Sequence, residues 1–197
     1  MSGHGHGHAA PEGHGEGGGH KGVALLIAIL ALMLAFSEMG GKYAEREAVI
    51  HNLESSNLWA FFQAKTIRRT TVQVAAEQME SQLGLAADGP VKSAMQQRIA
   101  DWRKTADRYE TEPSTGEGRK ELAERAKVAE EKRNHERARN ELFEVSSALL
   151  QIGIVLASAM IITGIAALAW VAGGLGGLSM IVMLLALLKP EVLHLLH

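Results

Sequence analysis

The sequence predicts an all-α membrane protein with three transmembrane helices and a long antiparallel cytoplasmic helical arm of the coiled-coil kind. Two stretches support the membrane part: residues 22–41 carry a single charge, Glu38, and residues 145–188 carry none. About 20 apolar residues cross a hydrocarbon core of roughly 30 Å, so the first stretch suits one span and the second suits two. Between them, residues 42–144 have the composition of charged helices, which predicts the arm.

The first 20 residues form a tail rich in His and Gly, with too few apolar side chains to bury a core, which predicts disorder. Imidazoles bind zinc, copper or nickel, so the tail is a candidate metal-binding segment. Glycine spacers give the imidazoles no fixed geometry, and a soluble leader that binds no metal is the alternative. The candidate ligands are His4, His6, His8, His14 and His20.

The three spans are expected at 21–41, at about 145–171 and at about 174–189, followed by a C-terminal tail at 190–197. The hairpin between the second and third spans needs a turn, and the Gly-rich "AGGLGG" at 172–177 is the expected place for it. Small residues allow close packing of helices in lipid, either between the three spans or between copies of the chain. The small residues on the expected packing faces are Ala24, Ala28, Ala31, Ala35, Gly153, Ala157 and Gly164.

Three helices are expected in the arm, at 42–85, 91–112 and 119–144, because "DGP" at 88–90 and "EPSTGEG" at 112–118 interrupt the helical pattern. The outbound helix would be about 65 Å long and the two return helices together about 70 Å. Both limbs start from the same membrane face, so the return limb should retrace the outbound one.

Three of the nine aromatic residues lie within four positions, at Trp59, Phe61 and Phe62. Trp59 would lie about 28 Å beyond Gly40, too far for an aromatic belt at the membrane surface. Counting the same distance back from Val145 reaches Ala126. The expected packing set is therefore Trp59, Phe61 and Phe62 against Leu122, Ala126 and Ala129. A helix lying flat on lipid, or a docking patch for another protein, is the alternative.

The run Trp59-Ala-Phe-Phe-Gln-Ala-Lys65, preceded by one span and a His-rich leader, resembles a bacterial family of small helical inner-membrane proteins catalogued as a domain of unknown function. The charged helix that continues into the apolar pair also resembles that family, and the similarity covers most of residues 20–188. The resemblance implies a helical fold in the bacterial inner membrane and brings no known activity.

The positive residues predict the orientation. Eighteen of the 20 Lys and Arg lie in residues 42–144, which places the arm and the C-terminus in the cytoplasm and the N-terminus in the periplasm. The same segment holds 18 Asp and Glu, so its net charge is zero, which argues against a nucleic-acid partner. The chain has no Cys, which excludes disulfides and thiolate chemistry.

These features favour a membrane-anchored helical scaffold or adaptor that acts through protein–protein contacts. A small homo-oligomeric channel or pore is the first alternative and metal handling by the tail is the second. We expect no enzymatic activity and no cofactor, because no nucleophile–base pair, metal-ligand helix or phosphate loop occurs in the sequence. The expected partners are the lipid bilayer, further copies of the chain and an unidentified protein.

Overall fold

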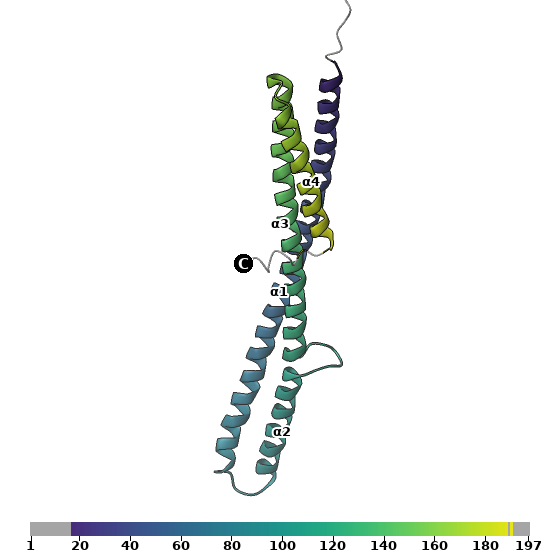
Figure 1. The fold of residues 1–197 in the computed structure, drawn as a ribbon. Helices are drawn as coiled ribbons and strands as arrows, with labels where there is room; N and C mark the ends of the chain where they lie inside the picture. The colour runs from purple at the N-terminus through teal and green to yellow at the C-terminus, as the bar shows by residue number, and fades with distance from the viewer. Residues whose placement is uncertain (1–16, 189, 191–197) are drawn as a thin grey trace, which may run out of the picture. The chain divides into compact units, whose positions relative to one another are not determined.

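The computed structural model describes residues 17–188 and Pro190, with side chains from Lys21 onward. Four helices account for most of these residues, and none of them lies in a strand. The helices are α1 (Gly17–Leu83), α2 (Pro90–Glu110), α3 (Arg119–Thr163) and α4 (Ala166–Leu188) (Figure 1). The prediction of an all-α protein is confirmed for this part of the chain.

The chain divides into two compact units. The described part of unit 1 comprises residues 17–41 and 141–188, and that of unit 2 comprises residues 42–140 and Pro190. Helices α1 and α3 each contribute residues to both units, whereas α4 belongs to unit 1 and α2 to unit 2.

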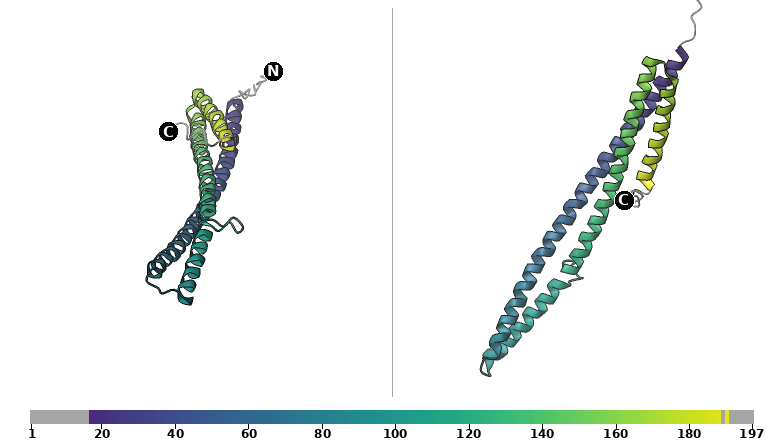
Figure 2. Two further views of the ribbon diagram at one scale, coloured as in Figure 1. Left: turned by 90° about the horizontal axis from the view of Figure 1, so that it is seen from below. Right: turned by 60° about the vertical axis from the view of Figure 1, so that its left-hand side comes forward.

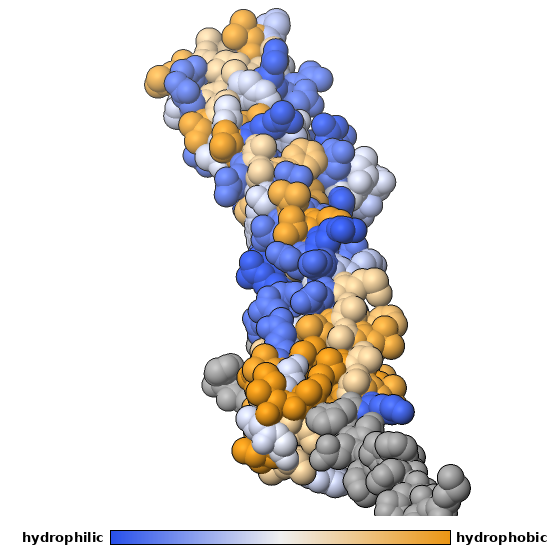
Figure 3. Space-filling view, turned by 90° about the horizontal axis from the view of Figure 1, so that it is seen from above, coloured by the Kyte–Doolittle hydropathy of each residue, from blue (hydrophilic) through white to orange (hydrophobic). Residues whose placement is uncertain are grey.

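Unit 1 is apolar. Among the described residues, α1, α3 and α4 are the three helices that are long and apolar enough to cross a membrane, judged by length and composition. Hydrophobic residues gather densely on one part of the visible surface, whereas hydrophobic and hydrophilic residues are mixed over the rest (Figure 3). The buried core of unit 1 consists of Val23, Leu30, Leu150, Ala157 and Ala172.

Close helix contact in unit 1 depends on glycines that face Leu30. A Cβ atom added to Gly176 would lie 2.6 Å from Leu30 Cδ2, and one added to Gly153 would lie 3.4 Å from Leu30 Cδ1. Leu30 is only 2% exposed. Glycine at these two positions therefore leaves room for the Leu30 side chain between the helices.

Hydroxyl groups connect the same helices. Ser37 Oγ donates to the carbonyl oxygen of Phe143 at 2.9 Å, and the Oγ atoms of Ser146 and Ser179 lie 2.7 Å apart. All three serines are buried, so their polar groups are satisfied inside the unit.

The contact between Gly40 and Phe143 gives a sharp test of this packing. A Cβ atom at Gly40 would lie 2.7 Å from Phe143 Cζ, and the ring is only 3% exposed, so it has little room to move. We expect Gly40→Ala to destabilise unit 1 by about 1–3 kcal/mol through overpacking. The measurement is unfolding of the full chain in mild detergent, followed by circular dichroism. Gly22→Ala is the matched control, because nothing lies within 4 Å of its added Cβ; equal stability of the two variants would contradict the expectation.

The predicted position of the hairpin turn is wrong. Helix α3 ends at Thr163 and α4 begins at Ala166, so the turn lies at Gly164 and Ile165 and not in 172–177. Gly164 has a φ of 71°, a left-handed conformation that ends helices well when the residue is glycine, and its N–H donates to the carbonyl of Met160. The Gly-rich run lies inside α4, where Gly176 provides room for Leu30. Helix α4 has 23 residues, so it is longer than the third span expected at about 174–189.

Unit 2 is built from the second half of α1, from α2 and from the first part of α3, which lie side by side in both ribbon views (Figures 1 and 2). Residues further along α1 contact residues progressively earlier in α3 and α2. Asn52 bonds Arg133, Trp59 bonds Glu130, and Glu80 pairs with Arg103.

The connections in unit 2 lie close to the predicted breaks. Pro90 occupies the first turn of α2, where its missing N–H costs no hydrogen bond. Helix α2 ends at Glu110, and residues 111–118 form the connection to α3 that loops out beside the helices (Figure 1). At the other end of the chain, α1 begins at Gly17, four residues before the predicted start of the first span.

Candidate functional site

The aromatic cluster of α1 packs against small and aliphatic residues of α3 in unit 2. Leu58, Leu122, Ala126 and Ala129 form a buried cluster, and Trp59 and Phe62 pack against it. The two rings meet edge to face, with centroids 5.4 Å apart. Ala126 is fully buried, so a small side chain on α3 accommodates the large rings on α1.

Glu130 fixes the orientation of the indole. Trp59 Nε1 donates to Glu130 Oε1 at 2.9 Å, and Ser55 Oγ donates to the same oxygen at 3.5 Å. A half-buried indole N–H needs an acceptor, and a carboxylate is a stronger acceptor than a neutral group. This contact ties α1 to α3 at a defined position along both helices.

Phe61 does not join this cluster. It faces outward with 36% of its surface exposed, while Trp59, Phe62, Leu122, Ala126 and Ala129 come together. The physical reason is helical geometry: Trp59 and Phe62 are three positions apart and share a face, whereas Phe61 is rotated about 100° from Phe62. The expectation that all three rings pack inward is therefore wrong for Phe61.

A buried lysine lies one turn beyond the rings. Lys65 is 5% exposed, and its Nζ lies 3.5 Å from Glu117 Oε2 and 3.9 Å from Glu112 Oε2. The same Nζ lies over the rings of Phe61, at 5.4 Å, and Tyr109, at 5.5 Å. A buried ammonium requires compensating charge, and the connection between α2 and α3 supplies it.

Two arginines extend this junction. Arg119 donates from Nη1 to Glu110 Oε2 at 2.6 Å and from Nε to Thr66 Oγ1 at 2.8 Å, and its guanidinium lies 4.8 Å from the centroid of Phe62. Arg69 Nε lies 3.2 Å from Glu110 Oε2, close enough for an ion pair although it is not aligned for a hydrogen bond. These residues, with Lys65, Glu112 and Glu117, join α1, the end of α2 and the start of α3; we call this set the Lys65 junction.

The Lys65 junction was not predicted from the sequence. Its residues come from two stretches more than 40 residues apart in the chain: 62–69, whose charges are all positive, and 110–119, whose charges are mainly negative. One signal was present: Lys65 follows the inward-facing positions 58 and 62 at helical spacing, which places a charge on the face that packs against α3. A cation at such a position implies anions on the opposite helix or its connection.

The small residues expected on the packing faces lie in three kinds of place: buried, in a turn, or exposed. Gly153 and Ala157 are buried in unit 1, whereas Gly164 forms the turn. On α1 the expected packing face is wrong for contacts inside unit 1, because the buried side chains there are Val23, Leu30 and Ser37, seven residues apart. Leu26, Ile27, Met33 and Leu34 are partly buried against the same core. The alanines lie on other sides of the helix and are exposed: Ala24, Ala28, Ala31 and Ala35.

The candidate metal ligands are not placed by the structure. His4, His6, His8 and His14 lie outside the described residues, and the side chain of His20 is likewise not described. Within the described part of the chain, no group of three or more His, Asp or Glu side chains is arranged to hold a metal ion.

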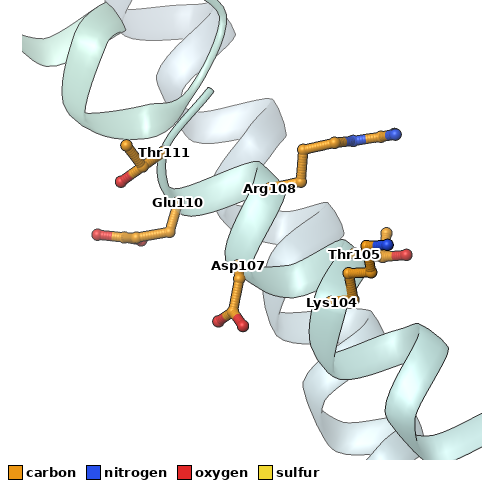
Figure 4. Close-up of a pocket in the computed structure, with 6 residues that line it drawn as sticks. All are labelled: Lys104, Thr105, Asp107, Arg108, Glu110 and Thr111. Carbon is orange, nitrogen blue, oxygen red and sulfur yellow. The ribbon is translucent and has the colours of Figure 1, made fainter. Parts of the chain in front are cut away.

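An open depression of about 580 Å³ lies at the C-terminal end of α2. Figure 4 shows that its side chains diverge, with Asp107 and Glu110 on one side and Arg108 on the other. Because these groups do not converge on one point, they do not form a binding constellation of the kind that holds a small ligand. The remaining lining residues are Lys104, Thr105 and Thr111.

Residues 20–189 match the family described as "Domain of unknown function (DUF4337)". No curated protein and no solved structure matches the chain. The match covers both units of the structure, including the rings at 59–62 and the Lys65 junction.

Proposed function

The chain belongs to the DUF4337 family of domains of unknown function, and we propose that it is a membrane-anchored helical scaffold or adaptor that acts through protein–protein contacts along unit 2. The arrangement that supports this proposal is the course of α1 and α3. Each helix runs without a break from an apolar, span-length segment into a charged segment, and the two charged segments pack together through Trp59 and Glu130.

For the membrane, we propose the bacterial inner membrane, with unit 2 as an antiparallel arm in the cytoplasm. Three spans put the N-terminal tail and the arm on opposite sides. The concentration of Lys and Arg in residues 42–144 assigns the arm to the cytoplasmic side.

The polar groups support contact rather than catalysis. In unit 2 the buried ammonium of Lys65 pairs with glutamates in the Lys65 junction, and in unit 1 the buried Ser37, Ser146 and Ser179 bond each other or backbone carbonyls. We therefore propose a non-enzymatic role. The pore and metal-handling alternatives gain no support from the described residues.

A photo-crosslinking experiment in native membranes tests the scaffold. A photoreactive amino acid is placed at Val128, an exposed position of α3 in unit 2, and separately at Trp170, which is 83% exposed in unit 1. We expect protein adducts from position 128 and lipid adducts from position 170, because only the arm should reach soluble partners. The position 170 variant is the control for membrane insertion. Lipid adducts from both positions, or aqueous labelling of both, would contradict the proposal.

A further inference from the structure

Unit 2 exposes large apolar side chains mainly on α1. Helix α2 and the unit 2 part of α3 expose one each, Val91 and Val128. The unit 2 part of α1 exposes seven: Tyr43, Val49, Ile50, Leu53, Phe61, Ile67 and Val74. A soluble helical surface normally scatters such residues, so their concentration on one helix requires a partner.

The exposed residues follow a heptad pattern. Five of the seven fall on one series of positions that advances by alternating steps of three and four, the a and d positions of a coiled coil. All members are exposed except Ala64, which is partly exposed. We call this series the outer seam: Tyr43, Arg46, Ile50, Leu53, Asn57, Ala60, Ala64, Ile67, Thr71 and Val74.

The outer seam is separate from the face that holds unit 2 together. None of the buried residues of α1 in unit 2 belongs to it. Those residues occupy the b and f positions of the same heptads, roughly opposite a and d on the helix. They are Ala44, Ala48, Ser55, Leu58, Lys65 and Ala76. Helix α1 therefore carries one buried face and one largely apolar face that is exposed.

We infer that a second copy of this chain packs on the outer seam, so that the two α1 helices form a parallel two-stranded coiled coil. The parallel direction rests on the proposed function, because two copies inserted the same way in one membrane have their α1 helices pointing the same way. The seam from Tyr43 to Val74 spans more than four heptads, about 48 Å of helix, which is long enough for a stable coiled coil.

The residue types on the seam favour two strands in one register. Ile50 at an a position followed by Leu53 at d is the combination that favours parallel dimers. Asn57 occupies the next a position, where two asparagines facing each other bond across the axis and specify both register and strand number. A lipid surface would not satisfy Asn57, which lies in the centre of the apolar stripe rather than at its edge.

The flanking charges agree with this register. In a parallel pair, each g residue faces the e residue five positions later on the other copy. Lys42 at g then faces Glu47 at e, twice by symmetry. The other g–e pairs place no like charges together; for example, Gln63 faces Arg68. Phe61 lies at an e position beside Ala60 and Ala64, where small side chains on the partner leave room for its ring. This contact accounts for the one ring that faces away from α3.

Disulfide trapping tests the inference, and the absence of Cys from the chain makes single-cysteine variants free of background. Leu53→Cys and Ile67→Cys are made in the full chain in native membranes and oxidised. In a parallel, in-register pair each d residue faces its own copy within the Cα separation that a disulfide bridges, roughly 4.4–6.8 Å. We expect covalent dimers from both variants. Val128→Cys, exposed on α3, is the matched control and should stay monomeric.

Mixing the two variants tests direction. Positions 53 and 67 lie about 21 Å apart along a helix, so parallel copies cannot form a mixed 53–67 disulfide. Mixed dimers in place of the two symmetric ones would overturn the parallel arrangement. Absence of dimers from both variants would overturn the inference. A monomeric protein whose two thiols become protected when lipid vesicles are added would overturn it as well.

A second variant uses a different readout. Leu53→Glu with Ile67→Glu places charges at two d positions without touching the buried face of α1. We expect the mass of the detergent-solubilised protein, measured by light scattering, to fall by half while its helix content stays constant. An unchanged mass would overturn the inference. Alkaline extraction of the same membranes separates this result from the proposed function. Protein that stays in the membrane without forming dimers refutes the seam alone. Dimers that are released from the membrane refute the membrane anchor alone.

Discussion

Replacing Trp59 by alanine is expected to lower the free energy of unfolding of unit 2 by about 3 kcal/mol, in the lower part of the range for large aromatic-to-alanine changes because the ring is only partly buried. The substitution removes the contact with Leu122, Ala126 and Ala129, and it leaves Glu130 without the indole N–H that it accepts at 2.9 Å. The measurement is urea unfolding of the full chain in mild detergent, followed by circular dichroism, because the tryptophan itself cannot serve as the probe.

Phe61→Ala is the matched control for Trp59→Ala. It removes a ring two positions away that faces outward and lies under the Lys65 ammonium group. We expect a loss below about 1 kcal/mol, as for exposed positions outside the core. Equal losses for the two variants would mean that the inward and outward faces of α1 are assigned wrongly.

The residues that pack around Trp59 could be predicted from the sequence, because the prediction depends only on counting residues along two helices. Both α1 and α3 change from apolar to charged composition, at about Gly41 and Val145, and equal distances from those two boundaries lead to Trp59 and Ala126. The structure contains both residues in one cluster. Helix type was derived equally well, since long runs without Pro and with helix-forming residues have few alternatives.

The turn between α3 and α4 could not be derived in the same way. Glycine serves two purposes in apolar helices, as a helix terminator and as space for a neighbouring side chain, and composition does not distinguish them. The four glycines in 172–177 made that stretch the expected turn, in preference to the single Gly164. The structure shows the reverse, because Gly176 leaves room for Leu30 and Gly164 makes the turn. The deciding contact comes from α1, more than 130 residues earlier in the chain.

The prediction that the alanines of α1 pack inside unit 1 was wrong for a related reason. Small residues on a helix face permit close packing but do not require it. In unit 1 the buried side chains of α1 are Val23, Leu30 and Ser37, which recur every seven residues. The alanines recur with the same period, so the period alone does not tell which face packs. The alanine face was the one expected from the sequence, and only the positions of α3 and α4 show that the face of Val23, Leu30 and Ser37 packs instead.

Replacing Lys65 by glutamate is expected to destabilise unit 2 by about 3 kcal/mol or more, comparable to breaking a buried ion pair. The new carboxylate would lie among Glu112 and Glu117, whose oxygens are now 3.9 and 3.5 Å from the ammonium nitrogen. Lys65 is 5% exposed, so water cannot screen the repulsion at that position as it would on the surface. Urea unfolding of the full chain measures the loss.

Two further variants separate charge from packing at Lys65. Lys65→Met keeps most of the side-chain volume and removes the charge; we expect a loss of about 1 kcal/mol, because Glu112 and Glu117 retain 20% and 50% of their side-chain exposure and can be hydrated. Adding Glu117→Lys to Lys65→Glu restores a pair of opposite sign and should recover part of the lost stability. If Lys65→Met and Lys65→Glu were equally destabilising and the charge swap recovered nothing, the lysine would hold α1 to the 111–118 connection by its hydrocarbon stem alone. The ammonium group lies close to two carboxylates and over two rings, all of which interact with its charge, and this arrangement argues for the opposite result.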